Sequence, residues 1–72
     1  MRFELENITA VILHEINVAR LNQAEVAKTC AIAIGQNSGD WHKINAAIVE
    51  RWSPSARERV LTMAWKIVED LL

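Results

Sequence analysis

The stretch that decides the fold is WHKINAAIVERWSPSARERVLTMAW, residues 41–65, because it holds two amphipathic patterns separated by one proline. Large apolar residues recur every three or four positions in its first half, at Trp41, Ile44, Ile48 and Trp52. That spacing places them on one face of a helix. Ser53-Pro54 then predicts the start of a new helix, since a serine hydroxyl caps a helix and proline suits its first turn. The stretch therefore predicts two helices joined at a sharp corner.

The region before this stretch also follows a helical period. The apolar residues that share its first face are Leu5, Ile8, Ile12, Ile16 and Ala19. Asn22 followed by Glu25 resembles an N-terminal capping box, which predicts that a second helix begins there. The chain has no glycine or proline before Gly35, so one continuous helix over residues 5–34 is also compatible with the sequence.

Residues 23–34 combine large and small apolar side chains at helical spacing. Val26, Cys30 and Ile34 fall on one side, and beside them lie Ala24, Ala27 and Ala31. These alanines either let another helix approach closely or simply favour helix formation, and the sequence leaves both readings open. Gly35 is predicted to cap the end of this helix. Ser38 or Asn37 is predicted to cap the next one, with Asp40 near its positive end.

The last predicted helix, which follows Pro54, has an unusually broad apolar surface. Its apolar residues span roughly 200° of the helix circumference, against about 100° for an ordinary surface helix. One part of that surface can pack inside the domain, which leaves the remaining flank free to contact another molecule. We predict that this flank is a partner or oligomer interface formed by Leu61, Trp65, Val68 and Leu72.

Length and composition limit the fold further. A chain of 72 residues forms one domain with a modest core. Its content of 51% hydrophobic residues is high for so small a domain, and an oligomer would bury the excess. We therefore predict a single all-α domain over residues 1–72, a small bundle of three to four helices that forms a homo-oligomer.

Several kinds of chemistry find no support in the sequence. Cys30 is the only cysteine, and a lone cysteine in a helical pattern is typical of a small buried residue in a reducing, cytoplasmic compartment. His14 and His42 have no cysteine or second histidine at the spacing of metal ligands. Near the Ser53-Pro54 corner, no histidine lies close in sequence to act as a base for Ser53, Ser55 or Thr62. We expect neither an enzyme nor a cofactor or metal site.

Charge and hydropathy argue against two classes of partner. The formal net charge is −1, so no overall positive field attracts nucleic acid. No apolar run approaches the roughly 20 residues that a membrane span needs, and we expect no membrane partner. QAEVAK at residues 23–28 resembles the opening of a helix-turn-helix, but the turn comes too late and the next helix lacks a basic recognition surface. DNA binding is therefore the third and weakest functional hypothesis.

A basic corner around Ser53 supports a second hypothesis, a sponge that binds a small nucleotide or another anion. The candidate residues are Arg51, Trp52, Ser53, Arg57 and Arg59. Guanidinium groups, a stacking ring and a helix N-terminus are suited to anions. Glu50 and Glu58 favour the alternative that the arginines are neutralised by local ion pairs.

The C-terminal part of the chain resembles a recurring sequence pattern. The pattern W-x-x-I-N-x-A-I-x-x-R-W-S-x-S-A, followed by A-W-K, covers Trp41 to Ala56 and Ala64 to Lys66. It resembles short open reading frames of tailed bacteriophages, for which no activity is assigned, and it implies a viral or prophage origin. Small phage proteins without a catalytic signature commonly bind and block host machinery or sequester a signalling nucleotide. The leading hypothesis is a non-enzymatic interaction protein that blocks a host factor, such as a component of antiviral defence.

Overall fold

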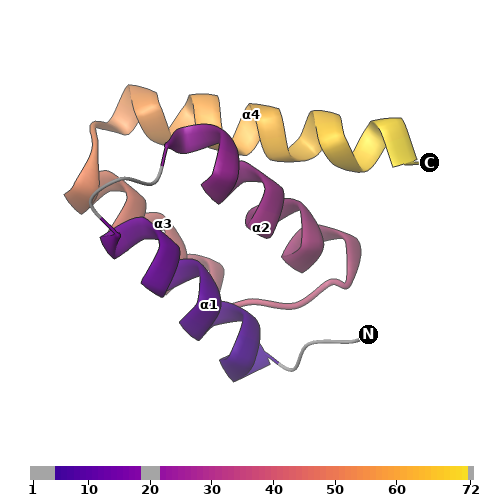
Figure 1. Cartoon of the computed structure of the whole chain (residues 1–72), viewed down its shortest axis with the longest axis horizontal. Helices are drawn as coiled ribbons and strands as arrows, with labels where there is room; N and C mark the ends of the chain where they lie inside the picture. The colour runs from indigo at the N-terminus through magenta and orange to yellow at the C-terminus, as the bar shows by residue number, and fades with distance from the viewer. Residues whose placement is uncertain (1–4, 19–21, 72) are drawn as a thin grey trace.

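Four helices make up most of the chain in the computed structural model, which describes residues 5–18 and 22–71 except for the side chains of Leu5 and Glu6 (Figure 1). They are α1 (Leu5–Asn17), α2 (Gln23–Gly35), α3 (Trp41–Arg51) and α4 (Pro54–Leu71). The described residues contain no strand. The prediction of an all-α bundle of three to four helices is therefore confirmed.

The first two helices are separate. α1 ends at Asn17, where the backbone N–H of Val18 donates to the carbonyl oxygen of His14 at 3.2 Å. Asn22 has extended backbone angles, and its side-chain oxygen accepts a hydrogen bond from the N–H of Glu25 at 3.0 Å. This is the capping arrangement that the sequence predicted. The alternative of one continuous helix is wrong.

The end of α2 differs from the expectation based on Gly35. The helix continues through Gly35, and the residue with left-handed angles is Asn37, with φ 51°. The N–H of Asn37 donates to the carbonyl of Ile34, and the N–H of Ser38 donates to that of Ala33. These two bonds form a Schellman motif around Asn37. Asparagine serves here in place of glycine because it tolerates the left-handed region better than other side chains.

The start of α3 also differs from the sequence prediction. The capping residue is Asp40, rather than Ser38 or Asn37, and its carboxylate accepts a hydrogen bond from the N–H of Lys43 at 3.2 Å. The N–H of Asp40 itself donates to the hydroxyl oxygen of Thr9 at 2.9 Å. Since Thr9 belongs to α1, this bond fixes the beginning of α3 against the first helix.

The corner between α3 and α4 confirms the prediction made from Ser53-Pro54. α4 begins at Pro54, and the hydroxyl of Ser53 accepts a hydrogen bond from the N–H of Ala56 at 3.2 Å. The carbonyl of Ser53 accepts from the N–H of Arg57 at 3.1 Å. The corner turns the chain sharply and sends α4 back across the bundle (Figure 1).

The helices contact one another in a closed ring. α1 packs on α2 and α3, and α4 packs on the same two helices. Within the described part of the chain, no Cα atom of α1 comes within 8 Å of α4, and none of α2 comes within 8 Å of α3. The most extensive of the contacts joins α2 and α4; α4 runs along the top of Figure 1, and α2 begins beneath it.

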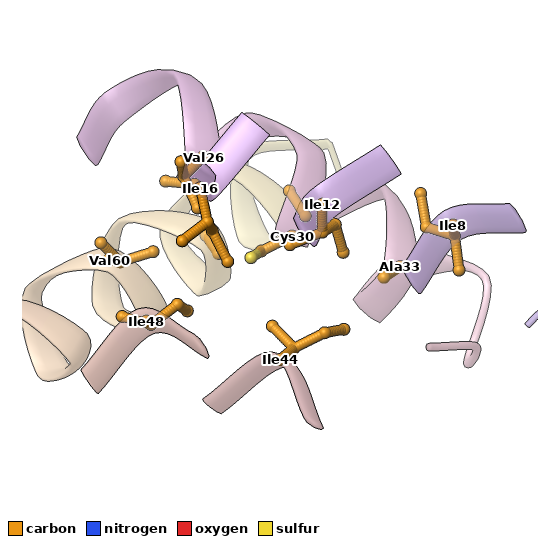
Figure 2. Packing of buried hydrophobic residues seen from close by; sticks show 12 residues of the cluster. Ile8, Ile12, Ile16, Val26, Cys30, Ala33, Ile44, Ile48 and Val60 are labelled. Atoms are coloured by element: carbon orange, nitrogen blue, oxygen red, sulfur yellow. The ribbon is translucent and has the colours of Figure 1, made fainter. Parts of the chain in front are cut away.

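One side of the core is built from isoleucine. The fully buried isoleucines of α1 and α3 are Ile8, Ile12, Ile16, Ile44 and Ile48. Figure 2 shows them directed into the interior, those of α1 above those of α3. These five residues form what we call the isoleucine seam, and they confirm the predicted inner faces of both helices.

The contact between α2 and α4 is built from smaller residues. The small side chains that these two helices bury in the core include Ala27 and Ala31 of α2 with Val60 and Ala64 of α4, which we call the alanine seam. Ala27 and Ala31 lie across α2 from Thr29, whose hydroxyl donates to the carboxylate of Glu15 on α1. They therefore face away from α1 and towards α4. Their burial supports the reading that alanine permits close approach here, whereas Ala24 is exposed.

Candidate functional site

A pocket of about 270 Å³ opens between the end of α2, the first half of α3 and the middle of α4. Its lining residues are Ile34, Asn37, Trp41, Asn45, Leu61 and Trp65. Two of the three tryptophans of the chain thus meet at one site, and we call it the tryptophan pocket. Its walls come from three helices that are consecutive in the chain and from Asn37 in the loop after α2.

The helical spacing explains how this pocket forms. Trp41 and Asn45 are four residues apart on α3, so they share one flank beside the buried Ile44. Leu61 and Trp65 are four apart on α4 and share a flank in the same way. The corner between α3 and α4 brings the two flanks together on one face of the molecule.

Trp65 is the most unusual member of the pocket. Its side chain is 54% exposed, although α4 buries Ala56 and Ala64 almost completely. Helices usually bury their large apolar residues and expose small ones. On this part of α4 the arrangement is reversed, because the small residues are buried and the large Trp65 is exposed. An exposed tryptophan in the wall of a pocket is a residue that a binding partner can cover.

The structure brings part of the predicted interface flank together. Leu61 is half-buried and lines the pocket with Trp65, as their shared helix face requires. Val68 is partly buried and packs against the core. Leu72 lies outside the described residues. The sequence prediction did not include the contributions of Trp41 and Asn45, which come from a different helix.

Asn45 adds an unsatisfied polar group to this largely apolar site. Its side-chain oxygen is buried and has no hydrogen-bond partner. A buried acceptor without a partner costs about 1–3 kcal/mol. Because the amide can present either its oxygen or its NH2 group to the pocket, Asn45 offers a hydrogen bond that the chain itself does not use.

A shallow groove lies on the other side of Trp65. It runs along the outer surface of α4 and shares Leu61 and Trp65 with the tryptophan pocket. Its charged lining residues are Glu58, Lys66, Glu69 and Asp70, three carboxylates against one ammonium group. We call it the acidic groove. Its charge is opposite to that of the predicted arginine corner.

The structure distributes the arginines of the corner over different surfaces. Arg51 lines a groove between α3 and α1 together with Leu13, whereas Arg59 lines another one with Gln23 of α2. Arg57 and Arg59 are two residues apart, and such residues lie on opposite sides of a helix. These three arginines therefore do not converge on a single site.

The remaining members of the arginine corner have structural roles. The hydroxyl of Ser53 caps α4, and Trp52 packs against the core. In the part of the chain that the structure describes, Lys28 with Glu25 is the only ion pair. Glu50 and Glu58 thus do not neutralise the arginines there. The nucleotide or anion site stays a prediction.

The thiol of Cys30 has low reactivity in this fold. It is fully buried, and burial, followed by the nearby carboxylate of Glu15, raises the pKa of its thiol from 9.0 to about 12. The thiolate, which is the reactive form, is therefore scarce at neutral pH. Residues 5–18 and 22–71 contain no group of three or more potential ligands among His, Cys, Asp and Glu that could hold a metal ion.

No helix in the described ranges has both the length and the apolar composition to cross a membrane. Comparison of the chain with protein-family models, with curated proteins and with solved structures found no match. The tryptophan pocket and its surroundings are therefore the basis for a functional proposal.

Proposed function

We propose that this chain is a non-enzymatic interaction protein that binds a partner protein through the tryptophan pocket. The observation that carries the proposal is the exposure of Trp65 in the wall of a pocket that also contains Trp41. Tryptophan is enriched among the few residues that dominate the energy of protein interfaces.

The size of the pocket supports a protein partner over a nucleotide. Its volume of about 270 Å³ is below the roughly 300–1,000 Å³ of sites that enclose a drug-sized ligand. A single large side chain fits a space of this size. The pocket then acts as the socket for one anchoring residue of a partner, and the surrounding surface excludes water from the contact.

The resemblance to phage reading frames supplies the biological setting of the proposal. The partner is a host protein, and binding blocks it by covering a surface that it needs, as in the inhibition of a defence component. Occlusion requires no chemistry from the small protein. The scarcity of thiolate at Cys30 is consistent with a role of this kind.

The test is capture of a partner from bacterial lysate with three matched proteins. They are the parent chain, Trp65→Ala, and Val11→Ala as a control that removes an exposed apolar residue from α1. We expect a host protein that is retained by the parent and the control and lost by Trp65→Ala. With the purified partner, we expect Kd to rise by about 30-fold or more, the effect of losing roughly 2 kcal/mol at an interface hot spot.

Equal affinity of all three proteins for the purified partner would refute the role of the pocket. Sedimentation of the purified chain is the necessary companion measurement, because the sequence predicts a homo-oligomer through the same flank. A dimer that Trp65→Ala disrupts, with no host partner, would replace the proposal by self-association.

A further inference from the structure

We propose that the partner segment which enters the tryptophan pocket is basic, and that an arginine side chain fills the pocket. This inference rests on the proposed function and specifies the chemistry of its partner. Three independent features of the site support it: the aromatic walls, the unused hydrogen-bonding group of Asn45 and the acidic groove beside Trp65.

The aromatic and aliphatic walls suit the two parts of an arginine side chain. The planar guanidinium group stacks on the faces of tryptophan rings, such as Trp41 and Trp65, through cation–π attraction. The methylene stem of arginine packs against aliphatic surface, which Leu61 supplies here. The pocket is open to solvent at its mouth, so the guanidinium charge need not be fully dehydrated.

Asn45 distinguishes arginine from a purely apolar anchor. A leucine or phenylalanine in the pocket would leave the amide oxygen of Asn45 without a donor. Arginine carries five N–H donors in a rigid fork, so it can donate to this oxygen once the amide of Asn45 turns it towards the pocket, and the ring stacking is retained. The binding of arginine thus recovers a hydrogen bond that the free protein lacks.

The acidic groove supplies the charge complementarity. Its carboxylates, Glu58, Glu69 and Asp70, form no ion pair within the described part of the chain. Because the groove and the tryptophan pocket share Trp65 as a wall, a cation at the pocket lies beside this negative surface. Further lysine or arginine residues of the same segment can follow the groove along α4.

The first experiment uses defined peptide probes on the intact, isotope-labelled chain. The probe is acetyl-Arg-Ala-Ala-Arg-Ala-Ala-Arg-amide, and its matched controls replace arginine by citrulline, lysine or leucine. The indole N–H signals of Trp41 and Trp65 and the side-chain amide signals of Asn45 are followed by NMR. Citrulline keeps the shape and hydrogen bonds of arginine but has no charge, so it isolates the charge contribution.

We expect the arginine peptide to shift these signals in a saturable way. The citrulline peptide should bind about tenfold more weakly, since a cation–π contact is worth roughly 0.5–2 kcal/mol and the groove adds attraction. Raising the salt concentration should weaken the binding of the arginine peptide and leave the binding of the leucine peptide unchanged. Equal binding of the leucine and arginine peptides would overturn the inference.

Variants of the chain test whether the arginine peptide binds at the tryptophan pocket. Trp65→Leu should abolish the shifts, and Asn45→Leu should weaken binding, whereas Val11→Ala should bind as the parent does. Glu69→Gln should reduce the salt dependence without removing binding. A melting curve for each variant verifies that it is folded. Unchanged binding by a folded Trp65→Leu variant would also overturn the inference.

The outcomes separate this inference from the proposed function. A host partner that depends on Trp65 but tolerates replacement of all its arginines would refute the arginine anchor and leave the interaction protein in place. Arginine-peptide binding at the pocket without any Trp65-dependent host protein would refute the proposed function instead. Signals of Trp65 that change with protein concentration alone would show that a second copy occupies the pocket, and would overturn both.

Discussion

The isoleucine seam and the alanine seam bury their helices in opposite ways. The isoleucine seam fills the space between α1 and α3 with large branched side chains that are almost fully buried. The alanine seam brings α2 and α4 together with small side chains, so the two backbones can approach closely. Both arrangements remove water from the interior. In the first, large side chains fill the space between the helices, and in the second, the helices are so close that little space is left.

This difference explains why the tryptophan pocket lies where it does. A helix that presents small residues to its neighbour does not need its large ones for that contact. α4 therefore carries Leu61 and Trp65 on a flank outside the alanine seam, beside the end of α2, where they are available to another molecule. In α1, by contrast, the large residues Ile8, Ile12 and Ile16 are used entirely inside the core.

The largest effect is expected from removing volume in the isoleucine seam. Ile12→Ala should lower the free energy of unfolding by about 2–5 kcal/mol, because it deletes buried methyl groups and leaves a cavity. Urea denaturation measures the change. Val11→Ala, at the adjacent and 39% exposed position, should differ from the parent by no more than about 0.5 kcal/mol. Similar losses at both positions would contradict the assignment of faces in α1.

The alanine seam should respond to added volume. Ala64→Leu should lower the free energy of unfolding by about 1–3 kcal/mol, since a larger side chain forces α4 away from the core. Ala24→Leu places the same group on the exposed side of α2 and serves as the control. If Ala64→Leu were as stable as the parent in the same denaturation experiment, close packing at that position would be disproved.

The burial of Cys30 should make the stability of the fold depend on pH. The unfolded thiol loses its proton near pH 9, whereas the folded thiol keeps it up to about pH 12. The raised pKa therefore stabilises the fold below pH 9, and this contribution is lost as the pH rises towards 12. The slope is about 1.4 kcal/mol per pH unit. Cys30→Ala should remove this contribution to the loss of stability at alkaline pH. The free energy of unfolding, measured against pH for the parent and the variant, checks this, and identical curves would contradict the raised pKa.

The smallest effect on stability is expected outside both seams. Trp65→Ala should cost about 1 kcal/mol or less, the usual range for a residue whose side chain is largely exposed. The same change is expected to abolish partner binding. A thermal melt compared with a binding titration tests both statements together. A loss of several kcal/mol would place Trp65 among the core residues and weaken the case for a binding role.

Much of the fold was predictable because local signals agreed with the tertiary structure. Asn22 with Glu25 and Ser53 with Pro54 correctly marked two helix starts, since capping depends on residues within one turn. The loop between α2 and α3 was less predictable. Its glycine at position 35 looked like the helix end, but Asn37 has the left-handed angles instead.

The candidate site was predictable only in part. Leu61 and Trp65 could be found from the broad apolar surface of α4, because that property belongs to one helix. Trp41 was assigned only to the inner face of α3, yet it lines the pocket as well. Asn45 gave no signal, because its importance depends on the tertiary placement of α4 beside it. One sequence pattern could nevertheless have indicated the pocket. Trp41 and Asn45 are four residues apart, as are Leu61 and Trp65, so each pair shares one face of its helix.

The closed ring of helix contacts also determines how the chain opens. Within the described residues, each helix touches two neighbours, so detaching any one of them uncovers two buried faces at once. The bond from the N–H of Asp40 to Thr9 joins the ring where α3 begins. Interior amide hydrogens should consequently exchange with solvent only when the whole domain unfolds, and fraying should be limited to the helix ends. A domain that opens all at once presents few partly unfolded forms to proteases, which would suit the interaction protein that we propose.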